Sequence, residues 1–253
     1  MPAWGPTIGP VHVDRFPTTH ATWIEAQLTI AETMGDGSPA GAAAHRSLRQ
    51  HLMERYRSPL EVYVRRSSMR GLGEPGELVA GFFAERLGNR DFLLSWRASG
   101  MPLRRWMMNG ISYYGRGVMR DRVRDRMRQF PAAEDGFEFD SGSLVEDRDA
   151  ARAFDEAWAL RMLNESIARV HADLDGAGRL DELEVFRRHV VDGMPYEPIA
   201  ADLGWSRQQC ANAVRRVGRR VREAMREVVR DDGVAPGEVE AAVREIIAVL
   251  MRG

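Results

Sequence analysis

The residues with the greatest potential for chemistry are arginines, and they cluster in two stretches. Residues 101–130 contain eight arginines and two acids, and residues 201–230 contain eight arginines and three acids. All 36 basic residues of this 253-residue chain are arginine. Guanidinium groups bind phosphate and guanine edges through paired hydrogen bonds, so the stretches indicate nucleic-acid binding. A GC-rich coding bias is the other explanation for the absence of lysine.

The second stretch fits a helix-turn-helix, in the sequence "YEPIAADLGWSRQQCANAVRRV". Ile199 and Leu203 are the apolar residues of the first helix, and Ala200 is small where the two helices must approach each other. Gly204 is suited to the turn, and Ser206 stands where the second helix needs an N-cap. The segment therefore predicts the two helices of a DNA-binding helix-turn-helix.

Two opposite faces are expected on the second helix. At about 100° per residue, one narrow sector is apolar and should be buried. The opposite face has amides and guanidinium groups, which read adenine and guanine in a major groove and bind phosphates. A solvated helix that only balances charge is the alternative. The apolar sector contains Cys210, Val214, Val217, Val221 and Met225. The predicted DNA contacts are Ser206, Arg207, Gln208, Asn212, Arg215, Arg216 and Arg219.

The whole chain has helical periodicity and almost no strand signals, which predicts an all-α fold. Its least helical stretch is "QFPAAEDGFEFDSGSLVEDRD", and residues 131–186 have fifteen acids against five arginines. We expect a helix bent or broken near Pro59 and a loop at "LLSWRASGMP". We expect two small helical domains, 15–130 and 151–232, joined by an acidic flexible linker at 131–150. Residues 233–253 form an amphipathic extension that packs on the second domain, on a partner or on a second copy.

The order of these segments resembles the extracytoplasmic-function (ECF) sigma factors of bacterial RNA polymerase. "ELVAGFFAERL", followed by "PLRRWMMNGISYYGRGVMRDRVRDR", is similar to their region 2. "MPYEPIAADLGWSRQQCANAVRRVGRRVRE" is similar to their region 4. "FPTTHATW" and "AFDEAWALRML" look like the ECF-like branch of planctomycetes. The resemblance covers residues 15–230 and is most specific in the order of its parts.

This resemblance implies a promoter-specificity subunit, which directs an enzyme but is not one itself and has no cofactor or metal. Its partners would be core RNA polymerase and promoter DNA, both as duplex and as melted strand, and an anti-sigma protein or another regulator is a further candidate. The helix-turn-helix would read the minus-thirty-five element. The polymerase contacts carried over from the family are Glu77, Leu78, Ala80, Gly81 and Phe82.

The resemblance assigns minus-ten recognition and strand opening to the segment from Arg97 to Arg128. Capture of a single strand needs cations for its backbone and aromatic faces for its unstacked bases. Burial in the core is the alternative for the aromatic residues. The predicted contacts are Arg97, Arg104, Arg105, Trp106, Tyr113, Arg116, Arg120 and Arg124.

The chain departs from the family pattern in the polymerase-binding helix. The family has Asp-Leu-x-Gln there, whereas this chain has Glu77-Leu78-Val79-Ala80 and so lacks the glutamine amide. Gly115 and Gly117 replace residues that are often polar in the family. The alternatives are therefore a stand-alone helix-turn-helix regulator that has lost polymerase binding, and an interaction protein without DNA contact.

Three further patterns complete the expectations. "DLDGAGRLDELE", residues 173–184, resembles a calcium loop in which Ala177 replaces an oxygen ligand, and an acidic connector is the alternative. The acidic linker is expected to fold against the DNA-binding faces of the free protein. Cys210 is predicted to be a small apolar residue of the core rather than a reactive thiol. A single cysteine, no signal-like N-terminus and no long apolar run predict a cytoplasmic protein that does not enter a membrane.

Overall fold

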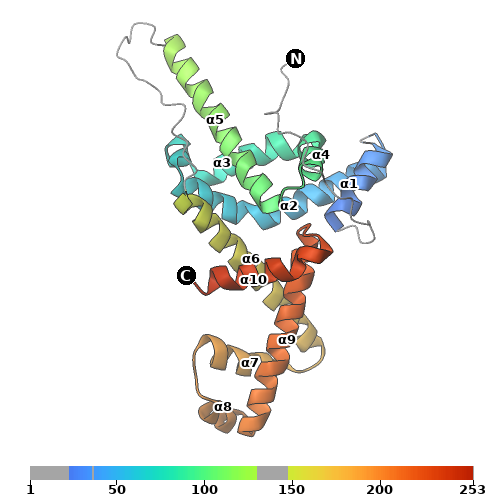
Figure 1. Ribbon diagram of the computed structural model, residues 1–253, viewed down its shortest axis with the longest axis vertical. Coiled ribbons are helices and arrows are strands. Elements are labelled where there is room, and N and C mark those ends of the chain that lie inside the picture. Colours follow the sequence, from blue (N-terminus) through green and yellow to red (C-terminus); the bar gives the residue numbers. More distant parts are fainter. Residues whose placement is uncertain (1–22, 36, 130–147, 253) are drawn as a thin grey trace.

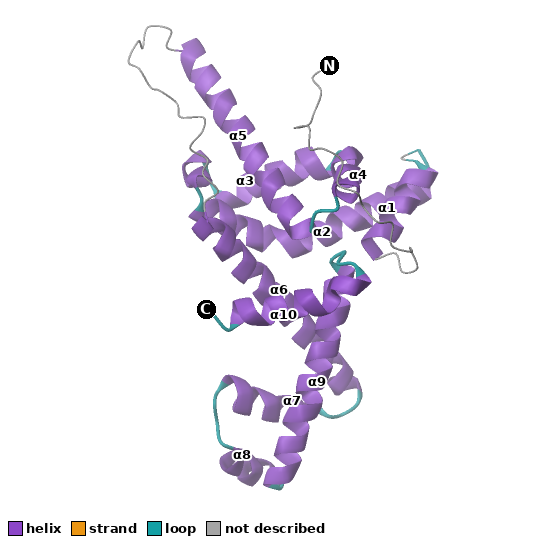
Figure 2. Cartoon of the chain, in the orientation of Figure 1, coloured by secondary structure: helices purple, strands orange, loops and turns teal. Residues whose placement is uncertain are grey.

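The computed structural model describes residues 23–35, 37–129 and 148–252. These residues form helices joined by turns, with no strand among them (Figure 2). The all-α prediction is therefore confirmed for this part of the chain. None of these helices is long and apolar enough to cross a membrane. The helices are α1 (Trp23–Met34), α2 (Pro39–Arg66), α3 (Pro75–Phe82), α4 (Arg90–Ser99), α5 (Leu103–Gln129), α6 (Arg148–Gly176), α7 (Leu180–Phe186), α8 (Tyr196–Leu203), α9 (Arg207–Asp231) and α10 (Val239–Leu250).

The stretch predicted as a loop before Pro102 is helix α4, so that prediction was wrong. The Asn89 side chain caps the helix by accepting a hydrogen bond from the Asp91 N–H at 2.8 Å. Leu93 and Trp96, three residues apart, are buried on its inner face. The helix stops at Gly100, whose φ of +66° is left-handed. The glycine and proline that suggested a loop therefore end this helix rather than exclude it.

Helix α2 is not broken at Pro59, although a proline there removes one backbone hydrogen bond. Its 28 residues are continuous from Pro39 to Arg66. Tyr56 and Leu60, on either side of the proline, are fully buried. Packing on both sides of the proline outweighs the cost of an interior proline, which is about 3 kcal/mol from the lost hydrogen bond and the clash with the preceding turn.

The largest apolar core joins segments from both sides of the predicted domain boundary. It includes most of the buried residues of α1–α5. It also includes Phe154, Trp158 and Met162 of α6, together with Val228 of α9 and Ile246 of α10. Each of these five side chains is almost fully buried. The first half of α6 and the end of α9 are therefore packed into the same core as the N-terminal helices.

A separate distal unit is formed by α7, α8 and the nearby parts of α6 and α9 (Figure 1). Val170 and Leu174 of α6 pack against Val217 and Val221 of α9 in one small core. The predicted division into two small domains is not confirmed, because α6 and α9 run from this unit into the main core. Most of the predicted linker lies outside the described residues, and its end, from Arg148, belongs to α6.

The C-terminal helix α10 buries its apolar stripe inside the chain. Val239, Val243 and Ile246 are at most 3% exposed. The helix contacts α6 and α9, and Glu245 forms an ion pair with Arg104 of α5 at 2.6 Å. The stripe therefore packs on α6 and α9, which lie largely within residues 151–232, and it belongs to the core that these helices share with α1–α5.

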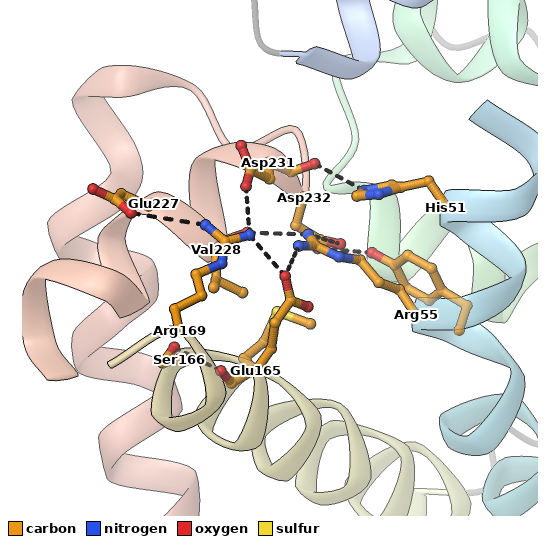
Figure 3. Close-up of polar contacts among 11 residues, drawn as sticks. His51, Arg55, Glu165, Ser166, Arg169, Glu227, Val228, Asp231 and Asp232 are labelled. Carbon is orange, nitrogen blue, oxygen red and sulfur yellow. Dashed lines mark hydrogen bonds and ion pairs between the residues drawn. The ribbon is translucent and has the colours of Figure 1, made fainter. Parts of the chain in front are cut away.

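A buried polar cluster occupies the junction of α2, α6 and α9 (Figure 3). The Arg55 guanidinium lies 2.7 Å from a Glu165 carboxylate oxygen and 3.4 Å from Asp232 Oδ1, and it donates to the Val228 carbonyl at 3.0 Å. The Tyr56 hydroxyl donates to Asp232 Oδ2 at 2.8 Å. Arg55, Tyr56 and Asp232 are each at most 3% exposed. We call these five residues the junction cluster.

Asp232 is expected to make stability depend on pH. Burial raises its pKa from the usual 3.8 to about 6, against the attraction of Arg55 and the Tyr56 hydrogen bond. Because the folded state binds this proton more tightly than the unfolded state, the stabilisation is complete below pH 3.8 and is lost as pH rises through 6. Between pH 7 and pH 4.5, wild type should therefore gain about 2 kcal/mol relative to Asp232→Asn.

Urea denaturation of both proteins at the two pH values measures this difference. His51, whose pKa is lowered to about 4 by burial and by Arg55, titrates in the same junction. It is present in both proteins, so only its coupling to Asp232 enters the comparison. A difference that is the same at both pH values would mean that folding does not shift the Asp232 titration.

Two glycines of α5, Gly115 and Gly117, differ in the space around them. A Cβ at Gly115 would lie 2.1 Å from the Met69 sulfur, whereas a Cβ at Gly117 would have no neighbour within 4 Å. Replacing either with alanine gains about 1 kcal/mol of helix propensity. We expect Gly117→Ala to stabilise the protein, and Gly115→Ala to be less stable than it by about 1–3 kcal/mol because of overpacking. Thermal unfolding of both variants measures this difference, and equal stability would contradict it.

Candidate nucleic-acid interface

The helix-turn-helix expected at residues 196–217 is formed by α8, a short turn and α9. Gly204 ends α8 with a φ of +65°, a left-handed conformation that favours glycine. The Trp205 N–H then donates to the Ala200 carbonyl at 2.9 Å. Ser206 Oγ accepts from the Gln209 N–H at 3.1 Å, while Gln209 Oε1 accepts from the Ser206 N–H at 2.6 Å. This reciprocal capping box fixes the start of α9.

The inner face of α9 has the predicted apolar stripe. Cys210, Val217, Val221 and Met225 are buried, and Val214 is half-buried. Cys210 packs with Ile199 of α8, and desolvation raises the pKa of its thiol. The structure therefore places the cysteine as a buried apolar residue, and α8 is held against α9 by this contact.

The outer face of α9 presents amide and guanidinium groups to solvent. Gln208, Arg215 and Arg219 are exposed, and Gln208 Nε2 donates to Asn212 Oδ1 at 3.1 Å. Among the described residues, neither Arg215 nor Arg219 has an ion-pair or hydrogen-bond partner. Four of the seven predicted contacts thus lie on one face, with two guanidinium groups available for a phosphate or a base edge.

The other two arginines of the predicted set already have carboxylate partners. Arg207 lies 3.0 Å from Glu197 of α8, in an exposed pair. Arg216 donates to both carboxylate oxygens of Glu182 on α7, at 3.1 and 3.2 Å. Desolvation raises the Glu182 pKa, but the hydrogen bonds from Arg216 and Arg179 outweigh it and lower that pKa. Arg216 therefore joins α9 to α7, while Arg215 beside it points to solvent.

The Ser206 cap gives a stability test of the helix-turn-helix. Ser206→Ala removes the acceptor for the Gln209 N–H, and we expect the free energy of unfolding to fall by about 1 kcal/mol. Urea denaturation followed by circular dichroism measures it. Ser47→Ala, at an exposed position within α2, is the matched control and should leave stability unchanged or slightly raise it. An equal effect of the two substitutions would mean that the cap does not stabilise α9.

The second half of α5 projects away from the rest of the described molecule (Figure 1). Arg116, Arg120 and Arg124 are exposed along it. Arg124 lies 3.4 Å from Asp121 on the same helix, and Arg116 and Arg120 have no partner among the described residues. Arg126 and Arg128 are exposed on the same projecting half but were not singled out from the sequence. The arginines continue at similar spacing to the end of α5, and this pattern could have predicted them.

Three other predicted DNA contacts are arginines already paired within the chain. Arg97 lies 2.7 Å from Glu32 of α1, and Arg105 lies 2.9 Å from Asp155 of α6. Arg104 pairs with Glu245 and stacks over Trp158, 4.8 Å from the ring centre. The Arg104 side chain is only 13% exposed. These arginines attach α4 and α5 to α1, α6 and α10, so the available cations of α5 begin at Arg116.

The aromatic residues of α5 divide between the core and the surface. Trp106 is half-buried and packs against Phe92, with ring centres 5.5 Å apart. Its ring N–H is buried without a hydrogen-bond partner among the described residues. Tyr113 is 46% exposed. Tyr113 is therefore the more exposed of the two predicted rings, whereas Trp106 packs against the core.

The five residues proposed to bind polymerase also divide. Glu77 and Ala80 are exposed and Gly81 is half-buried, but Leu78 and Phe82 belong to the core. The Tyr114 hydroxyl would lie 2.3 Å from a Cβ at Gly81, so this glycine allows α5 to approach α3. Of these five residues, Glu77, Ala80 and the Gly81 backbone are accessible to a partner.

No family model, curated protein or solved structure matches the chain.

The calcium loop suggested by residues 173–184 is not formed. Asp173 and Asp175 belong to the last turns of α6, and α7 begins at Leu180. Glu184 is paired with Arg187 at 2.8 Å, and Glu182 with Arg216. No three metal-ligating side chains come together in the described part of the chain. In the described structure the segment therefore connects α6 to α7 and does not bring the predicted ligands together.

Proposed function

We propose that the chain is an ECF-like sigma factor, which binds core RNA polymerase and directs it to specific promoters in the cytoplasm. The proposal depends chiefly on the exposed amide and arginine face of α9, the second helix of the helix-turn-helix, whose start is fixed by the Ser206 capping box. Gln208, Arg215 and Arg219 on that face have the donors needed to read base edges in a major groove. This surface would bind the minus-thirty-five element as duplex.

The projecting half of α5 supports the second part of the proposal. Arg116, Arg120 and Arg124 are exposed along it, and Tyr113 is a partly exposed ring at its base. A row of cations with an adjacent ring suits a single strand whose bases have left the stack. This surface would bind the opened minus-ten element, while Glu77 and Ala80 on α3 would contact polymerase.

In vitro transcription with core polymerase tests the proposal. Run-off transcripts from genomic fragments should appear only when the chain is added. The variant Arg116→Ala/Arg120→Ala should lose about tenfold or more in transcription, because it removes two backbone contacts at the opened strand. Arg46→Ala/Arg49→Ala, which removes the same charge from α2, is the matched control and should transcribe normally. Identical transcripts with and without the chain would refute the proposal.

A stand-alone helix-turn-helix regulator is the second candidate. It is favoured by Ala80, which lacks the amide of the family pattern, and by the burial of Leu78 and Phe82. Immobilised chain should retain core polymerase if the first proposal holds. Salt-sensitive DNA binding without polymerase retention would favour the regulator.

A further inference from the structure

The two proposed DNA surfaces lie at opposite ends of the molecule. The projecting half of α5 is at one end of its longest axis, and the start of α9 is at the other end (Figure 1). Helices α6 and α9 connect the distal unit to the main core. With 29 and 25 residues they extend for about 43 and 37 Å, at 1.5 Å per residue. Their length separates the two surfaces.

One part of α6 and one part of α9 are packed into the main core, and both helices continue without a break into the distal unit. Phe154, Trp158 and Met162 of α6 share one core with Val228 of α9 and Tyr56 of α2, and each is at most 2% exposed. Close-packed cores have few alternative arrangements, so rotation of α6 against α2 would open cavities. The apolar contacts therefore resist relative motion of the two ends.

The junction cluster adds directional bonds to this packing. Arg55 of α2 contacts Glu165 of α6 and both the Val228 carbonyl and Asp232 at the end of α9. A buried guanidinium with three acceptors has a defined orientation, because loss of any acceptor leaves a buried charge unsatisfied.

An outer layer of contacts continues the cluster toward solvent (Figure 3). Arg169 of α6 lies 2.8 Å from Glu165 and 2.7 Å from Asp231 of α9. His51 of α2 bonds to the Asp231 carbonyl at 3.2 Å. Glu165 thus has two guanidinium partners, which outweigh desolvation and lower its pKa. The same three helices are therefore joined twice, in two layers.

We propose that the junction cluster makes the chain a rigid spacer, which itself selects the distance between the two promoter elements. This inference rests on the proposed function. Adding one base pair to duplex DNA moves an element by about 3.4 Å and rotates it by about 35° around the axis. A rigid protein can accommodate such a change only by twisting or bending the DNA, which costs free energy. The preferred spacing should therefore be sharp.

Spin-label distances test the rigidity directly. Labels are placed at Asp125→Cys on α5 and Ala201→Cys on α8, both exposed, with the buried Cys210 replaced by alanine. The free protein should give one narrow distance distribution. The double variant Arg55→Met/Asp232→Asn, which removes both charges together, should give a broad one. Arg57→Met, at an exposed position on α2, is the control and should remain narrow. A broad distribution in the parent, or a narrow one in the double variant, would overturn the proposal.

Promoters of altered spacing test the functional consequence. On a promoter found by the run-off assay, a change of two base pairs in the spacer should lower transcription about tenfold with the parent chain. The double variant should show a much flatter dependence, with unchanged affinity for duplex that contains the minus-thirty-five element alone. The double variant could instead keep an equally sharp dependence of transcription on spacer length while its label distances are broadly distributed. That result would show that polymerase sets the spacing. If no promoter responds to the chain, the proposed function fails and the spacing role fails with it, whereas the label distances still report rigidity.

Discussion

Replacement of Arg55 by alanine is expected to lower the free energy of unfolding by about 3–5 kcal/mol. The substitution removes one guanidinium and leaves Asp232 buried, while the Tyr56 hydroxyl still donates to it at 2.8 Å. Glu165 keeps Arg169, so the larger part of the cost falls on Asp232 and on the unsatisfied Val228 carbonyl. Urea denaturation at pH 7, followed by circular dichroism, measures the change.

The control for this measurement is a second arginine of the same helix. Arg57→Ala removes an exposed i,i+4 pair with Glu61, in which the arginine side chain is 65% exposed. Such pairs contribute about 0.3–0.5 kcal/mol, so the control should be almost as stable as wild type. If Arg55→Ala were equally mild, the junction cluster would not stabilise the fold.

The parts of the fold that local signals specify could be predicted from the sequence. Gly204 and Ser206 predicted the turn and the cap, and the spacing from Cys210 to Met225 predicted the buried stripe of α9. Each of these features depends on residues within a few turns of one another. A pattern of near neighbours is sufficient for such features.

The packing between distant segments could not be predicted in this way. Phe154 and Trp158 indicated an apolar face on α6, but its contact with α2 joins residues about a hundred positions apart. The predicted domain boundary followed composition, whereas the core follows these long-range contacts. Likewise, the local helical pattern around α4 was masked by the Gly100 and Pro102 that end it.

The partners of individual arginines could not be predicted from local sequence patterns either. Arg104 and Arg116 lie on the same helix and look alike in sequence, yet Arg104 pairs with Glu245 and Arg116 is exposed. Arg215 and Arg216 differ in the same way, because only Arg216 meets Glu182. An arginine-rich composition therefore serves two purposes here: some guanidinium groups join helices, and the others form the exposed cationic surfaces.

This division of arginines leads to a sharp expectation for DNA binding. If Arg215 contacts a base, Arg215→Ala should cost about 1–3 kcal/mol on the cognate duplex, a loss of about 5–150-fold in affinity, and much less on a scrambled duplex. Fluorescence anisotropy at several salt concentrations, with holoenzyme and both duplexes, measures this. An equal loss on every sequence, with the salt slope reduced by about one, would reassign Arg215 to a phosphate.

Arg216→Ala is the matched comparison, because it removes the same charge from the next position of α9. Its guanidinium is held by Glu182, so its loss should lower the stability of the distal unit and leave the preference for the cognate duplex intact. The two variants should therefore separate, one in sequence preference and the other in unfolding. If Arg216→Ala reduced the sequence preference as much as Arg215→Ala, Arg216 would have to leave Glu182 when DNA binds, and α7 would be part of the reading surface.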